Sequence, residues 1–139
     1  MNTNFHYTVG WPELAETVAR VQVSLPPVGR QSAAILAADD GQAGAITLYG
    51  PRYGLPPAIS GMNSNWLRGY GQHPPSTVIT VGFKQDFGEH NFETCRWAAH
   101  IPTPYGITNG SIDGYADVFV CHGLRYPWSD FWPRFLYFG

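Results

Sequence analysis

The sequence predicts one α/β domain: an open, three-layer sheet of about four or five mostly parallel strands with flanking helices, in a Rossmann-like topology. Two observations indicate this fold. Short apolar runs bounded by turn residues alternate with segments of helical spacing, which is typical of βαβ units. The 139 residues are enough for one domain, and 44% hydrophobic against 13% charged residues argues against a disordered chain.

The domain is expected to open with a helix that starts near Pro12, because proline suits the first helical turn. Apolar residues recur at helical spacing after it, and Pro26 and Pro27 end the pattern. The run Ser32–Ala38 then predicts a strand that is buried on both faces.

A helix over 41–49 should follow this strand directly, with Asp39 or Asp40 as its cap. Strand, capped turn and helix together form the start of a βαβ unit. A second strand over 56–60 should be short and lie near a sheet edge, because its two prolines lack the N–H groups that a ladder needs.

The clearest central strand is Thr77–Gly82, which is β-branched and continuously apolar. A short helix or turn over 85–90 should follow it. The last strand is Ala116–Cys121, and a closing helix is expected over 128–137. The last two strands are joined by a loop without helical pattern, so they could pair antiparallel.

The segment Phe92–Ile101 partly alternates and predicts a strand in a half-exposed position of the sheet. Strict alternation assigns its side chains to two faces: Glu93, Cys95, Trp97 and Ala99 on one, and Thr94, Arg96, Ala98 and His100 on the other.

Residues 10–139 are assigned to the domain, whereas residues 1–9 show no pattern and are expected to be disordered or foreign to the natural chain. The net charge is −2 and the basic residues are scattered, which argues against a nucleic-acid partner. The longest apolar runs fall far short of the roughly 20 residues that span a bilayer, and no signal peptide is recognisable.

Polar side chains follow the ends of the first three predicted strands. In an open α/β sheet, ligands bind beyond the carboxyl ends of the strands, where the strand order reverses. This rule gathers a polar cluster with an aromatic platform that could hold a sugar or a nucleotide. The alternative is that the aspartates cap a helix and the asparagines form turns. The candidate ligand or acceptor contacts are Asp39, Asp40, Gln42, Asn63, Asn65 and Trp66, with Phe83 and Lys84 beside them.

No motif supports catalysis or a cofactor. The turn Asp39–Gly44 lacks the glycine arrangement of a dinucleotide site, and two acidic residues would repel phosphate. Adjacent aspartates are weak evidence for a hydrolase, which needs two carboxylates on either side of a sugar. The five histidines show no metal-ligand spacing. We therefore expect no catalytic residue, metal or cofactor in this chain.

Two cysteines, Cys95 and Cys121, are expected on neighbouring strands. They are either two small buried side chains or one disulfide, because an even count permits pairing and unpaired cysteine is often buried.

Four stretches of the sequence carry a resemblance to a known family, and the second and third of them mix aromatics, Gly and Pro in an order that composition would not give. The four stretches are Gly10–Ala15, Gly44–Pro56, Ala58–Trp66, and Cys121–Arg125 together with Trp132–Arg134. In these stretches the chain resembles the C-terminal soluble region of family 39 membrane glycosyltransferases, the relatives of dolichyl-phosphate-mannose-protein mannosyltransferases and lipid A aminoarabinose transferases.

The resemblance implies a periplasmic domain of an enzyme that moves a sugar from a polyprenyl-phosphate carrier to an acceptor. The partner of the domain would then be the membrane-embedded part of the parent enzyme, which holds the catalytic acid. The domain itself would serve folding, acceptor recognition or covering of the membrane site, and an extracytoplasmic location would allow the cysteines to oxidise. The alternative is a free-standing small α/β domain that binds a sugar or another small ligand.

Overall fold

The structure is a computed structural model that describes residues 11–27, 30, 33–38, 40–56, 58–60, 75–101, 117–127 and 130–131. The helices in these ranges are α2 (Trp11–Ser24), α4 (Asp40–Tyr49) and α6 (Gln85–Asn91), with a 3₁₀ turn η1 (Gly50–Tyr53). The strands are β1 (Ala34–Ala37), β2 (Ile59–Ser60), β3 (Thr77–Val81), β4 (Phe92–His100) and β5 (Asp117–Leu124). The predicted closing helix lies outside the described residues, apart from Asp130 and Phe131, which are helical.

The strands form one mixed sheet in the order β2-β1-β3-β5-β4. β1 pairs in parallel with β2 and β3, whereas β5 pairs antiparallel with both β3 and β4. The predicted short edge strand and the predicted central strand are thus confirmed in β2 and β3. The last two strands are antiparallel, and parallel pairing is confined to one half of the sheet, so "mostly parallel" was too broad an expectation.

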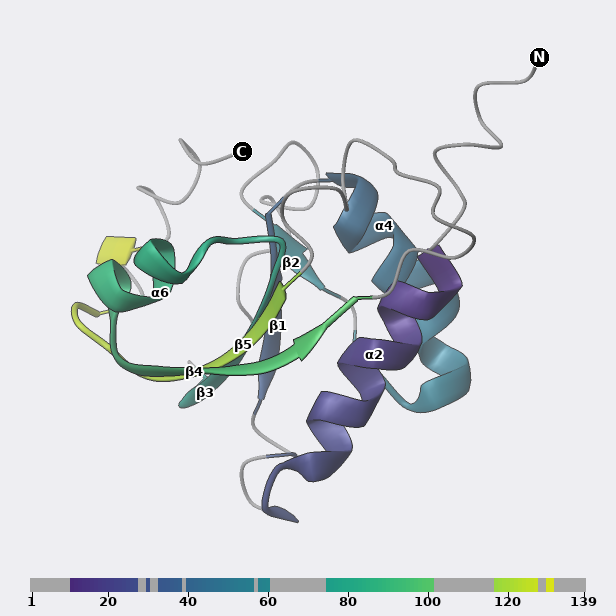
Figure 1. Cartoon of the computed structure of the whole chain (residues 1–139), viewed down its shortest axis with the longest axis horizontal. Helices are drawn as coiled ribbons and strands as arrows, with labels where there is room; N and C mark the ends of the chain where they lie inside the picture. The colour runs from purple at the N-terminus through teal and green to yellow at the C-terminus, as the bar shows by residue number, and fades with distance from the viewer. Residues whose placement is uncertain are drawn as a thin grey trace.

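Hydrophobic clusters cover both faces of this sheet. Ile79 and Val81 of β3 belong to the cluster that includes buried residues of α2 and α4, and Val78 belongs to the other cluster. The second cluster includes Phe92, Phe131 and, at its margin, Phe87 of α6. Figure 1 shows α2 and α4 on one side of the strands and α6 on the other. The central strand is buried on both faces because its β-branched residues pack in each direction.

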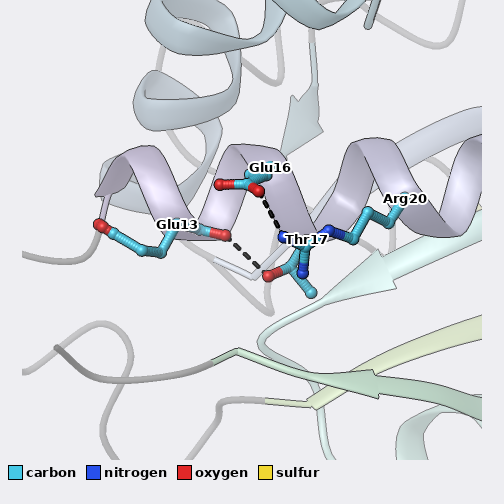
Figure 2. A network of polar contacts seen from close by, with 4 residues as sticks. All are labelled: Glu13, Glu16, Thr17 and Arg20. Carbon is cyan, nitrogen blue, oxygen red and sulfur yellow. Dashed lines mark hydrogen bonds and ion pairs between the residues drawn. The ribbon is translucent and has the colours of Figure 1, made fainter.

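Helix α2 has a buried stripe and a polar side. Leu14 and Val18 are fully buried one helical turn apart, which is the spacing that the sequence shows. The buried Thr17 hydroxyl donates to the Glu13 carbonyl at 2.7 Å, and on the exposed side Arg20 forms an ion pair with Glu16 (Figure 2). The buried stripe attaches the helix to the sheet, because an exposed ion pair contributes little stability.

Candidate functional site

The carboxyl edge of the parallel strands is the natural place for a site. After β1 the chain forms α4 and then β2, which pairs with one side of β1. The next strand, β3, pairs with the other side of β1. The strand order therefore reverses between β1 and β3. β4 runs in the same direction as β3, since both are antiparallel to β5. The end of β4 and the start of β5 consequently lie at this same edge.

The turns after β1 and β3 are held together by Gln42. Its side chain is 1% exposed, and its Oε1 accepts a hydrogen bond from the backbone N–H of Ala38 at 3.2 Å. The same N–H donates to the carbonyl of Val81 at 3.0 Å. A Cβ on Gly82 would lie 2.2 Å from Gln42 Oε1, and the φ of Gly82 is 86°. Both conditions favour glycine at position 82, which lets the turn after β3 approach Gln42 closely at the point where the strand order reverses.

The polar cluster predicted from sequence is only partly described. Asp39, Asn63, Asn65 and Trp66 lie outside the described residues. Asp40 begins α4 and its side chain is not described, while Gln42 is engaged within the protein as given above. The two residues predicted beside the cluster, Phe83 and Lys84, are among the described residues. Phe83 is buried and stacks on Phe87 with ring centroids 4.0 Å apart, and Lys84 is exposed at the start of α6.

The structure instead brings together Trp97, His100 and Asp117 at the carboxyl edge. The indole N–H of Trp97 donates to Asp117 Oδ1 at 3.0 Å, and His100 Nδ1 lies 3.1 Å from the same oxygen. Trp97 is 58% exposed although it is the largest type of apolar side chain. The cluster therefore offers an aromatic face, a carboxylate and an imidazole at the surface.

Both neighbours favour the ionised form of Asp117. The hydrogen bond from Trp97 lowers the pKa of this carboxyl most, the hydrogen bond and charge of His100 lower it further, and partial burial opposes them. The net direction is a pKa below the ordinary value. Asp117 therefore carries a negative charge at neutral pH, and it forms an ion pair with His100 whenever the imidazole is protonated.

Strict alternation along β4 gave the wrong faces for this cluster. It put Trp97 and His100 on opposite faces, but the register between β4 and β5 shifts between Trp97 and Ala99. Trp97 pairs with Phe119 and His100 pairs with Asp117, two residues that share one face of β5. The irregularity adds a residue to β4 and returns His100 to the side of Trp97. The sequence carries no glycine or proline there that would signal it.

Near the middle of the β4–β5 pair, Cys95 and Cys121 face each other directly. They form a disulfide with an S–S distance of 1.98 Å and a Cα–Cα distance of 4.0 Å, between residues 26 apart in the sequence. Helix α6 packs closely on it, since a Cβ on Gly88 would lie 2.6 Å from Cys95 Sγ. The disulfide thus joins the two strands under a helix that has no room for a side chain at this point.

Within the described part of the chain, no group of three or more His, Cys, Asp or Glu side chains is arranged to hold a metal ion. The described helices include none that is long and apolar enough to cross a membrane. Comparisons with protein-family models, with curated proteins and with solved structures give no match. The interpretation of the site therefore depends on its own geometry.

Proposed function

We propose that this chain is an extracytoplasmic domain of a membrane glycosyltransferase that uses a polyprenyl-phosphate sugar. In this proposal the membrane-embedded part of the parent enzyme performs the transfer, and the domain recognises the acceptor or covers the membrane site. The observation that carries the proposal is the Cys95–Cys121 disulfide. Disulfides form and persist in oxidising compartments such as the periplasm, which is where the resemblance places the domain.

The strand order supports a binding role at the carboxyl edge. The arrangement β2-β1-β3, with α4 as the crossover between β1 and β2, corresponds to part of a Rossmann-like, doubly wound sheet. We include this three-layer Rossmann-like topology in the proposal as the architecture of the domain. Domains of that architecture bind their ligands beyond the carboxyl ends of the parallel strands. The cluster of Trp97, His100 and Asp117 lies at that edge of the sheet, on β4 and β5 and not between β1 and β3 where the strand order reverses.

The chemistry of the cluster favours recognition over glycosyl transfer or hydrolysis. Those reactions use a pair of carboxyl groups on either side of the sugar or a comparable acid and base in fixed positions. Asp117 is instead hydrogen-bonded through Oδ1 by Trp97 and His100, and both neighbours favour its ionised form. An ionised carboxylate with a lowered pKa is a good hydrogen-bond acceptor and a poor proton donor.

The genomic sequence upstream of this chain provides the test. We expect it to continue the reading frame through many hydrophobic segments before Trp11. In the full-length enzyme, deletion of the domain should lower sugar transfer to the acceptor, and the purified domain alone should not turn over a polyprenyl-phosphate sugar. A promoter and translation start placed directly before Met1, or turnover by the isolated domain, would overturn the proposal. The first of these results would favour a free-standing small-ligand-binding domain.

A further inference from the structure

Trp97 is exposed, yet its orientation is fixed. Its indole N–H is bound to Asp117 Oδ1, so the side chain has little freedom to turn its ring toward the protein. A side chain that is already held in one orientation loses less conformational entropy when a ligand binds. The exposed face of the ring is therefore a flat surface that a ligand can contact without reorienting the side chain. The N–H edge of the indole is hydrogen-bonded to the carboxylate of Asp117.

Asp117 keeps hydrogen-bonding capacity for a ligand. An ionised carboxylate has about four lone-pair sites, and the two bonds described here both reach Oδ1. No described residue bonds to Oδ2. His100 uses Nδ1 toward Asp117, which leaves its Nε2 directed elsewhere as a donor or an acceptor. An acceptor and an imidazole nitrogen thus lie beside the aromatic face.

We infer that Trp97, Asp117 and His100 form a binding site for a neutral pyranose sugar. The C–H face of the sugar ring packs on the exposed indole, one or two hydroxyls donate to Asp117 Oδ2, and a further hydroxyl bonds His100 Nε2. A small number of convergent polar groups beside an apolar surface is what fixes the orientation of a small ligand. This inference rests on the proposed function, because it identifies the acceptor that the domain recognises as a sugar. Binding of the sugar itself requires only the domain and not the membrane enzyme.

Other classes of ligand fit these groups less well. A phosphate or another anion is repelled by the ionised Asp117. A purely apolar ligand would desolvate the carboxylate without giving it a partner, which is costly. A quaternary ammonium would suit the indole and the carboxylate. The two N–H donors already bonded to Oδ1, and the positive charge that His100 gains on protonation, both weaken the attraction for a cation.

The test follows the indole N–H signal of Trp97 by ¹H–¹⁵N NMR, assigned through its absence in Trp97→Phe. Methyl α-D-mannopyranoside, methyl β-D-glucopyranoside and methyl β-L-arabinopyranoside are titrated into the labelled domain, with inorganic phosphate and tetramethylammonium in parallel. We expect at least one pyranoside to shift the Trp97 signal with a saturable curve and a dissociation constant on the order of millimolar. Phosphate should leave the signal unchanged.

Variants separate the contributions of the three side chains. Measured by calorimetry or by other signals of the site, Trp97→Ala should weaken pyranoside binding at least about tenfold. Trp97→Phe should retain part of the affinity because it keeps an aromatic face, and Asp117→Asn should weaken binding by removing the charged acceptor. Tyr53→Ala removes another partly exposed aromatic side chain, in η1, and should leave binding unchanged. Thermal unfolding of each variant confirms that it is folded.

The inference is overturned if no pyranoside saturates the Trp97 signal, or if Trp97→Ala and Tyr53→Ala bind the sugar equally well. Saturation by tetramethylammonium alone also overturns it and indicates a cation site. The outcome is separable from that of the proposed function. Sugar binding by a protein that starts at Met1 would uphold the site and overturn the membrane parent, whereas upstream membrane segments without sugar binding would do the reverse.

Discussion

The parallel and antiparallel halves of the sheet are stabilised in different ways. In the parallel half, every residue of β3 is buried, and apolar side chains pack on both faces. In the antiparallel half, β4 lies at the edge and most of its residues are exposed or half-buried. In addition to the backbone pairing, a disulfide and bonds between polar side chains join β4 to β5. The exposed half can therefore carry surface groups for recognition, and the buried half supplies the support.

The largest effect should come from a cavity in the parallel half. Ile79 is fully buried at the centre of β3, so Ile79→Ala should lower the free energy of unfolding by about 4 kcal/mol in urea denaturation. Thr94→Ala, on the exposed edge strand, is the matched control and should change it by no more than about 0.5 kcal/mol. Equal losses of unfolding free energy for the two variants would contradict the difference in burial between the two halves of the sheet.

The parallel half was largely predictable because its signals are local. A continuous apolar run indicates a strand that is covered on both faces, and Ser32–Ala38 and Thr77–Gly82 became β1 and β3. Helical spacing between proline boundaries likewise predicted α2. The boundaries differ by a few residues, because helix and strand ends depend on hydrogen bonds that composition does not specify.

The antiparallel half was less predictable because its arrangement depends on long-range pairing. Nothing in the sequence of β5 says that it lies between β3 and β4, and the apolar residues of β5 are compatible with several neighbours. The same holds for the candidate site. The partnership of Trp97 with His100 depends on an irregular register in β4, and strict alternation separates the two residues. Gln42 was named as a ligand contact, but burial against Gly82 could be seen only in three dimensions.

Removal of the disulfide, which lies in the antiparallel half, should have the next largest effect on the stability of the domain. The closed loop spans a separation of 26 residues. Cys95→Ala with Cys121→Ala should therefore cost about 3 kcal/mol by chain-entropy reasoning. Thermal unfolding of the oxidised protein, the reduced protein and the double variant measures the loss. Mass spectrometry of unreduced protein from an oxidising compartment should find no free thiol, and two free thiols would contradict the pairing.

Gly88→Ala provides a control for the close packing of α6 on the disulfide. With the disulfide present, the Cβ that this substitution adds would lie 2.6 Å from Cys95 Sγ, so the substitution should be destabilising. In the double alanine variant both sulfurs are gone and the nearest remaining atom is the Cβ of residue 95 at 3.1 Å, so Gly88→Ala should be less destabilising there than in the wild type. Equal effects in the two backgrounds would show that α6 does not rest on the disulfide.

A smaller effect is expected at the junction of the two turns in the parallel half. Gly82→Ala should cost about 2 kcal/mol, because its φ of 86° is unfavourable for any residue with a Cβ and because that Cβ meets Gln42. Combining it with Gln42→Ala removes the steric conflict but not the backbone strain. We expect a coupling free energy of about 1 kcal/mol between the two substitutions in a double-mutant cycle. If the two losses of unfolding free energy were strictly additive, the side chain of Gln42 would move away from residue 82 without cost.

The smallest effect concerns Asp117, whose side chain is only partly buried. Its pKa is lowered by Trp97 and His100 in the folded protein, so the unfolded chain binds a proton more readily. The stabilisation is therefore fully present above the unfolded pKa of about 4 and is lost as the pH falls through the lower folded pKa. We expect the stability difference between wild type and Asp117→Asn to stay level above about pH 5 and to shrink as the pH falls below about 4. The carboxyl ¹³C shift of Asp117 should give a midpoint below its ordinary value. A midpoint above it would mean that burial outweighs both hydrogen bonds, and Asp117 would then lose the charge on which its role as an acceptor depends.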